Sequence, residues 1–95
     1  MAGKKSVRAI IRGRVQGVCY RMETVRAAEN NNVTGWVKNR PDGTVEAFFE
    51  GEKSHVDAMI EWCRKGPPAA SVKEVEAEEK IYSGQFKDFS VRYTA

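Results

Sequence analysis

The chain has 95 residues and a mass of 10.7 kDa, which is the size of a single compact domain. Hydrophobic residues make up 41% and charged residues 31% of the sequence, a balance that excludes an intrinsically disordered chain. The formal net charge of +3 and the pI of about 9.0 favour an anionic ligand, but they are too small to require nucleic acid.

Two further properties bear on where the protein works. The cysteines, Cys19 and Cys63, are too few for a disulfide framework. No apolar run is long enough to span a bilayer, and residues 1–5 lack the apolar stretch of a signal peptide. We therefore expect a protein of the reducing cytoplasm that has no contact with a membrane.

The first third of the chain predicts a strand, a glycine-containing loop and a helix. Apolar side chains occupy alternate positions over 7–11, which is the spacing of a strand. After the loop, a helix is expected over 21–30, and the asparagines at 30–32 should end it because asparagine tolerates the left-handed conformation. Three side chains are expected to form the apolar face of this helix: Met22, Val25 and Ala28.

The middle of the chain predicts a β-hairpin. Strands are expected over 33–39 and 44–50, joined by Pro-Asp-Gly at 41–43, where proline presets one dihedral angle and glycine accepts a positive φ. In the second of these strands, the side chains expected on one face are Val45, Ala47 and Phe49.

The remaining sequence predicts a helix followed by two strands. Ser54 is expected to cap the helix, and Gly66 with the two prolines after it should end the helix. The apolar residues at positions i, i+3, i+4 and i+7 of this helix are Val56, Met59, Ile60 and Cys63. A charged edge strand is then expected over 72–81 and a final strand over 89–93, with alternating apolar residues.

The expected order of elements is therefore β-α-β-β-α-β-β. Two helices on one face of a mostly antiparallel sheet of four to five strands form the ferredoxin-like sandwich, an α+β fold. We expect residues 1–95 to form one such domain. Because this fold carries many unrelated activities, the function has to be argued from particular residues.

The most informative segment is Gly-Arg-Val-Gln-Gly-Val-Cys-Tyr-Arg at 13–21. Its glycines let backbone N–H groups converge, the helix start adds positive potential, and Arg21 supplies the planar, permanently charged donor that suits a phosphate. The segment lacks the Gly-Lys-Ser/Thr of a P-loop and the glycine spacing of a dinucleotide site. Cys19 is also too close to Arg21 for a cysteine-phosphatase loop. On these residues alone, a phosphate site and an ordinary strand-to-helix turn both remain open.

Other candidate residues carry weaker signals. Asn39, beside the Pro-Asp-Gly turn, could be an amide that orients a water molecule, but the residues alone favour a turn-forming asparagine. A single histidine, His55, predicts no histidine-based metal site. Cys19 has no base beside it that would make it a nucleophile. Five aromatic residues are expected to serve packing rather than base stacking: Tyr20, Trp36, Phe48, Phe49 and Trp62.

Three blocks of the sequence resemble the acylphosphatase family. They are the segment 13–21, the segment Gly-Trp-Val-Lys-Asn-Arg-Pro-Asp-Gly-Thr-Val-Glu at 35–46, and the ending Phe-Ser-Val-Arg-Tyr at 89–93. The blocks have the family's spacing, and the resemblance covers nearly the whole chain. The resemblance implies a ferredoxin-like acid-anhydride hydrolase that cleaves carboxyl-phosphate bonds.

The resemblance also implies roles for particular residues. Arg21 matches the family's phosphate-binding catalytic arginine, and Asn39 matches its water-orienting asparagine. A backbone cradle for the phosphoryl group is implied for Val15, Gln16, Gly17, Val18, Cys19 and Tyr20. No metal or cofactor is implied. The expected substrate is a small acyl phosphate, with inorganic phosphate as product and competitive inhibitor, and nothing requires more than a monomer.

Two other functions stay open at this point. The basic first third and the pair Phe48-Phe49 suggest an RNA-binding ferredoxin-like module, although 44–50 lacks the basic-glycine-aromatic pattern of such modules and carries two glutamates. We therefore expect no nucleic-acid partner. A non-catalytic module that binds a small anion is the third hypothesis, against which the pair Arg21 and Asn39 argues.

Overall fold

The computed structural model describes residues 3–17 and 19–93. Its elements, in chain order, are β1 (Lys4–Arg14), α1 (Tyr20–Asn30), β2 (Thr34–Asn39), β3 (Val45–Glu52), α2 (Lys53–Lys65), β4 (Ser71–Lys80) and β5 (Phe89–Val91). Val18, Thr94 and Ala95 lie outside the described residues.

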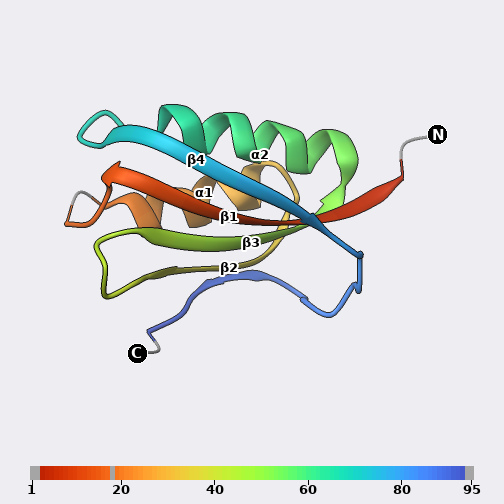
Figure 1. Ribbon diagram of the computed structural model, residues 1–95. Coiled ribbons are helices and arrows are strands. Elements are labelled where there is room, and N and C mark those ends of the chain that lie inside the picture. Colours follow the sequence, from red (N-terminus) through yellow and green to blue (C-terminus); the bar gives the residue numbers. More distant parts are fainter. Residues whose placement is uncertain (1–2, 18, 94–95) are drawn as a thin grey trace.

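The strands form one five-stranded sheet in the order β4-β1-β3-β2-β5. All neighbouring strands are antiparallel except β2 and β5, which run parallel. Both helices cover the same face of this sheet (Figure 1). The predicted ferredoxin-like sandwich is therefore confirmed. Within the described part of the chain, neither helix has the length and apolar character needed to cross a membrane.

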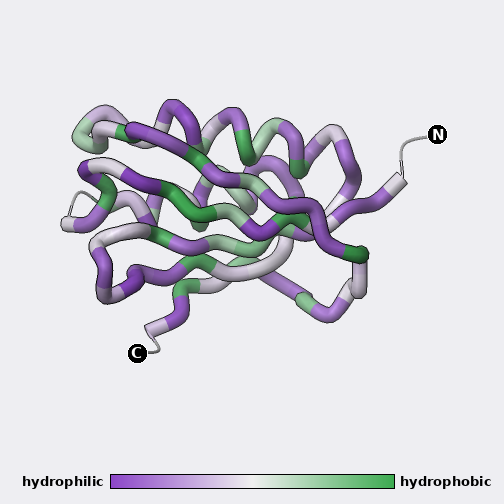
Figure 2. The backbone as a smooth tube through the Cα atoms, in the orientation of Figure 1, coloured by the Kyte–Doolittle hydropathy of each residue, from purple (hydrophilic) through white to green (hydrophobic). Residues whose placement is uncertain are grey.

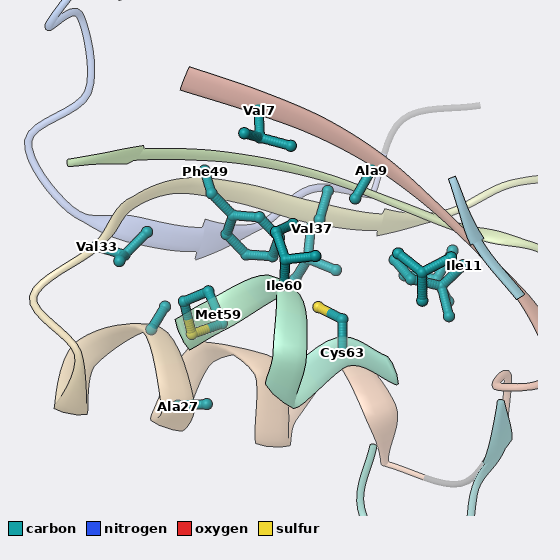
Figure 3. Close-up of a cluster of buried hydrophobic side chains, with 14 of the residues drawn as sticks. Val7, Ala9, Ile11, Ala27, Val33, Val37, Phe49, Met59, Ile60 and Cys63 are labelled. Carbon is teal, nitrogen blue, oxygen red and sulfur yellow. The ribbon is translucent and has the colours of Figure 1, made fainter. Parts of the chain in front are cut away.

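The core lies between the sheet and the two helices, and its periodic parts were predicted correctly. Val45, Ala47 and Phe49 of β3 are fully buried. The predicted face of α2 is buried in full, with Met59, Ile60 and Cys63 pointing toward the sheet (Figure 3). The thiol of Cys63 is free, and burial raises its pKa to about 12.

The apolar face predicted for α1 was wrong for Met22, whereas Ala28 is fully buried and Val25 packs partly buried against the core. Met22 is 58% exposed, and the buried residues of this helix are Tyr20, Thr24, Ala27 and Ala28. Thr24 can occupy a buried position because its hydroxyl donates to the carbonyl oxygen of Tyr20 at 2.7 Å. The buried side of α1 thus includes Tyr20 and Thr24, and Met22 lies on the surface.

The start of α2 also differs from the prediction. The helix begins at Lys53, so Ser54 lies inside it and does not cap it. Strand β3 leads directly into α2 through an extended Glu52, which makes no side-chain capping bond. The backbone N–H of Lys53 instead donates to the carbonyl oxygen of Gly3 at 2.9 Å, so the N-terminal segment satisfies the first free N–H group of this helix. Helix α1 ends at Asn30 and α2 at Lys65, as predicted. Residues with a positive φ follow each end, Asn32 at 56° and Gly66 at 69°.

The edge strand β4 is strongly hydrophilic (Figure 2). Its acidic side chains Glu74 and Glu76 are exposed and lie 3.9 Å and 2.9 Å from the guanidinium of Arg12 on β1. Charged side chains along an edge discourage pairing with a strand of another chain. The predicted solvated edge strand is confirmed.

The face of the sheet opposite the helices carries an aromatic group. The rings of Trp36 and Phe48 stack with their centroids 6.2 Å apart, and Phe86 packs against Phe48 at 5.6 Å. The guanidinium carbon of Arg92 lies 4.8 Å from the centroid of the Trp36 ring. These rings therefore pack against one another and against Arg92, as expected for packing residues.

A buried carboxylate fastens the connection between β4 and β5 to the sheet. Glu50 is 1% exposed, and its Oε2 accepts hydrogen bonds from the hydroxyls of Ser6 at 2.7 Å and Ser83 at 2.8 Å. The backbone N–H of Ser83 donates to the same oxygen at 3.2 Å. Burial raises the pKa of Glu50, but these hydrogen bonds outweigh burial and leave the pKa below its usual value of 4.5. Glu50 thereby holds the segment that leads into β5.

We expect Glu50→Gln to lower the free energy of unfolding by about 1 kcal/mol at pH 7, because a neutral acceptor makes weaker hydrogen bonds. The pKa of Glu50 is lowered by folding, so the carboxylate stabilises the fold above pH 4.5 and this contribution is lost as the pH falls through the folded-state pKa. Urea unfolding of both proteins should therefore differ at pH 7 and converge in acid. Glu29→Gln, on the exposed surface of α1, is the control; an effect of Glu50→Gln that does not change with pH would contradict this prediction.

Candidate active site

The glycine loop begins where β1 kinks against β4. The pairing register of these strands shifts between Arg12 and Gly13. Gly13 has a φ of 127°, and a Cβ there would lie 2.3 Å from the carbonyl oxygen of Ser71, so only glycine fits. The chain then turns through Gly17 at φ 73° and Cys19 at φ 61°, both left-handed. These conformations end β1 and start α1 within a few residues, as the sequence predicted.

Tyr20 fixes the beginning of α1 in the core. Its ring is 1% exposed and packs near Trp62, with 5.6 Å between ring centroids. Its hydroxyl donates to the carbonyl oxygen of Cys63 at 2.9 Å, and burial raises its pKa well above the usual value. Tyr20 therefore holds the helix N-terminus, whose free N–H groups and dipole favour an anion, at a defined place beside the loop.

Arg21 lies in the first turn of α1 and is half-buried. Its guanidinium carbon is 5.3 Å from the centroid of the Tyr93 ring. Among the described residues, no carboxylate lies within 4.0 Å of its side-chain nitrogens, whereas Arg8 and Arg12 are each ion-paired. The donors of Arg21 are thus available to an anion in front of the helix.

Asn39 is the last residue of β2, at the end of the sheet where β1 leads into the loop (Figure 1). Its Oδ1 atom is buried and has no hydrogen-bond partner within the described part of the chain. A buried acceptor without a partner is costly unless a water molecule or ligand supplies the missing donor. Asn39 therefore presents an acceptor suited to a water molecule.

Gln16 joins the loop to the hairpin that follows Asn39. Its Nε2 atom donates to the carbonyl oxygens of Arg40 at 2.9 Å and Thr44 at 2.8 Å. The hairpin is further held by Asp42, whose Oδ1 accepts from the N–H and the hydroxyl of Thr44 at 3.0 Å and 2.6 Å. The side chain of Gln16 thus fixes the position of the loop relative to the strand end that carries Asn39.

We expect Gln16→Ala to lower the free energy of unfolding by about 1 kcal/mol, because it removes two hydrogen bonds, while the carbonyl oxygens of Arg40 and Thr44 keep the backbone N–H donors of Gly43 and Arg40. Urea unfolding measures this loss, and Gln85→Ala, at an exposed loop position, is the matched control. Equal stabilities of the two variants would contradict the role of Gln16.

A pocket of about 320 Å³ brings most of the predicted site residues together. The residues that line it are Val15, Gly17, Cys19, Tyr20, Arg21, Met22, Asn39, Val91 and Tyr93. Of the predicted residues, Gln16 does not line the pocket, and Val18 lies outside the described residues. His55 lines a separate pocket together with Glu50 and Glu52.

Three lining residues were not identified from the sequence. Met22 was assigned to the core face of α1, although its neighbour Arg21 was assigned to the site. Val91 ends β5 and Tyr93 follows it, and their place in the site depends on the parallel pairing of β5 with β2. The resemblance of 89–93 to the family's ending was the only available signal for these two.

The arrangement is suited to binding an anion and positioning a water molecule beside it. Arg21 and the N-terminus of α1 supply positive potential, and Asn39 supplies a neutral acceptor. The other titratable groups among the described lining residues are the exposed free thiol of Cys19 and the phenols of Tyr20, whose pKa is raised, and Tyr93; none of them is a carboxyl or an imidazole group. The pocket therefore suits a reaction whose leaving group departs without a proton.

Comparisons with known proteins identify the family. The acylphosphatase family model matches residues 7–91. An acylphosphatase from Rubrobacter xylanophilus is 52% identical over 88 residues, which are 93% of this chain and 80% of that protein. The structure of an acylphosphatase from Coxiella burnetii is similar with a TM-score of 0.89 and 37% identity, over 94% of this chain and 93% of that one. The structure of the Bacillus subtilis acylphosphatase gives a TM-score of 0.90 at 34% identity, over 94% and 99%. The chain therefore belongs to the acylphosphatase family and is an enzyme of the hydrolase class.

Proposed function

We propose that the protein hydrolyses the carboxyl-phosphate bond of acyl phosphates to a carboxylate and inorganic phosphate. The observation that carries this proposal is that Arg21 and the unpartnered amide oxygen of Asn39 line the same pocket. The guanidinium of Arg21 suits the phosphoryl oxygens, and the amide oxygen of Asn39 suits the attacking water. Membership of the acylphosphatase family supports the same reaction.

In the proposed reaction, the phosphoryl group lies between the guanidinium of Arg21 and the backbone N–H groups of the loop 15–20. Phosphoryl transfer passes through a loose transition state, so catalysis depends mainly on positioning and on stabilising charge at the phosphoryl oxygens. Arg21 is a planar double donor with permanent charge, which matches two of these oxygens.

Asn39 places the nucleophile. Its Oδ1 atom accepts a hydrogen bond from a water molecule and holds that water in line with the departing oxygen. The bond from the water oxygen to phosphorus forms as the bond from phosphorus to the acyl oxygen breaks. The electron pair leaves with the carboxylate, and the water proton passes to a phosphoryl oxygen. No general acid is needed because a carboxylate departs without being protonated.

Further properties belong to the same proposal. Inorganic phosphate should compete with the substrate, because both require Arg21 and the loop. The protein should act without a metal or cofactor and as a monomer. The free thiols of Cys19 and Cys63 agree with the cytoplasm as its location.

The test is hydrolysis of acetyl phosphate and benzoyl phosphate by the purified protein in the presence of a metal chelator. We expect turnover that the chelator does not reduce and that inorganic phosphate inhibits competitively. Phosphate binding measured by calorimetry without hydrolysis of either compound would instead support a non-catalytic anion-binding module. Turnover that the chelator abolishes would contradict the metal-independent mechanism.

A further inference from the structure

The loop 15–20 and the hairpin between β2 and β3 belong to parts of the sheet that diverge from each other. Strand β1 pairs with β3 only as far as Ile11, which lies opposite Val45. Its pairing with β4 continues to Arg14, opposite Ser71. Because β4 and β3 lie on opposite sides of β1, the chain enters the loop on the side away from the hairpin.

The loop is also held at both ends by parts of the chain other than the hairpin. At its beginning, Gly13 lies directly against the backbone of β4 at Ser71. At its other end, the hydroxyl of Tyr20 donates to the carbonyl oxygen of Cys63 on α2 at 2.9 Å. These contacts place the loop relative to β4 and α2, but not relative to the strand end that carries Asn39.

The side chain of Gln16 connects the loop to the hairpin. Among the described residues, the side-chain hydrogen bonds between these two segments are those from Nε2 of Gln16 to the carbonyl oxygens of Arg40 and Thr44. The hairpin is closed without Gln16, because the same oxygens accept the backbone N–H groups of Gly43 and Arg40. Loss of this side chain should therefore leave both segments folded, but no longer fixed with respect to each other.

The relative position of the two segments matters for the proposed reaction. The loop and Arg21 hold the phosphoryl group, whereas Asn39 holds the attacking water. In-line attack needs reacting atoms that are aligned and about 3–3.5 Å apart, and a displacement of about 1 Å can lower the rate about 100-fold. Asn39 directly precedes Arg40, so one bond from Gln16 ends beside the residue that places the water.

We propose that Gln16 is a positioning residue, which sets the distance and the angle between the bound phosphoryl group and the water held by Asn39. This inference rests on the proposed function and adds to it a side chain that contacts neither reactant, since Gln16 does not line the pocket. It acts through Asn39, so it affects turnover and not the affinity for phosphate.

The test compares kcat with the affinity for phosphate in Gln16→Ala. We expect kcat for acetyl phosphate to fall by about 10- to 100-fold, while the inhibition constant for inorganic phosphate changes by less than about threefold. Gln85→Ala, at an exposed loop position, is the control and should keep both values of the wild-type protein. Urea unfolding of each variant checks that it is folded at the temperature of the assay.

A double-mutant cycle tests whether Gln16 acts through Asn39. In the Asn39→Ala background the water is no longer placed, so adding Gln16→Ala should lower kcat by about threefold or less. Losses of kcat that multiply in the double variant would show that Gln16 acts independently of Asn39, and would overturn the proposal.

Gln16→Glu is a second variant, of nearly the same size as the wild-type residue. An ionised carboxylate cannot donate to the two carbonyl oxygens, whereas a protonated carboxyl group can donate one hydrogen bond. We expect kcat of this variant, taken relative to the wild-type protein at each pH, to be low at pH 7 and to rise in acid. A relative kcat that does not change with pH would overturn the role of the donated bonds.

The outcomes separate this proposal from the proposed function. If the wild-type protein hydrolyses no acyl phosphate, both proposals fail. If it does, an equal kcat of Gln16→Ala and Gln85→Ala overturns the positioning role alone. A loss of phosphate affinity in Gln16→Ala as large as its loss of kcat would show that the side chain supports the phosphate cradle, and would also overturn that role.

Discussion

Arg21→Ala is expected to lower kcat/KM for acetyl phosphate by about a thousandfold or more, since arginines that stabilise phosphoryl transfer contribute effects of this size. The guanidinium is the one full positive charge among the described lining residues of the pocket. Its loss should weaken both the binding of phosphate and the stabilisation of charge in the transition state. Steady-state kinetics with acetyl phosphate measure the change.

Two further variants separate charge from geometry. Arg21→Lys keeps a positive charge but lacks the planar fork, so we expect it to recover only a small part of the lost activity. Arg26→Ala removes an exposed arginine from the same helix, where it lies 3.4 Å from Glu23, and should keep the activity of the wild-type protein. Full activity of Arg21→Lys would show that the fork is not required.

Asn39→Ala is expected to reduce kcat by about 100- to 1000-fold, because the attacking water loses the group that places it in line. The binding of inorganic phosphate should change far less, since its oxygens are held by Arg21 and the loop. The inhibition constant for phosphate, measured beside kcat, therefore distinguishes a role in placing water from a role in binding. Asn30→Ala at the exposed end of α1 serves as the control.

Two results would contradict this role of Asn39. Turnover that survives Asn39→Ala would mean that the water is placed by another group. An equal loss of phosphate affinity and of kcat would mean that Asn39 belongs to the phosphate site itself. A general collapse of the strand end is checked by urea unfolding of the same variant.

The parts of the fold that follow from local periodicity could be predicted from the sequence. Strand β3 alternates, and α2 presents one apolar face, so each pattern identifies both the element and its buried side. The full buried side of α1 could not be predicted in this way. Its buried side depends on Thr24, whose hydroxyl is satisfied by a backbone carbonyl within the helix, and that bond does not show in a hydrophobicity pattern.

The residue types of the candidate site could be predicted from the sequence, but it was harder to predict which of these residues lie together. The loop 13–21 suggested an anion site from its glycines and arginine alone. Asn39 stood out only through the family resemblance, because an asparagine beside a turn is ordinary. That both residues line one pocket depends on strand order.

The bonds of Gln16 and the positions of the C-terminal residues are set by distant parts of the chain. Gln16 reaches carbonyl oxygens 24 and 28 residues further along the chain. Val91 and Tyr93 reach the pocket because β5 pairs parallel to β2, at the far side of the sheet from β4. No local pattern encodes such contacts, so they emerge only from the structure.

The central place of β1 in the sheet has a consequence for how the chain folds. Strand β1 is paired on both sides by strands that follow it in the chain, since Ser6 lies opposite Glu50 on β3 and opposite Lys80 on β4. Its second neighbour, β4, therefore becomes available only after residue 80 has left the ribosome. Closing such long loops before any pairing is gained slows folding relative to a helical bundle. Until then, the apolar residues of β1 that later form the core stay exposed, and the early chain depends on its many charged residues to remain in solution.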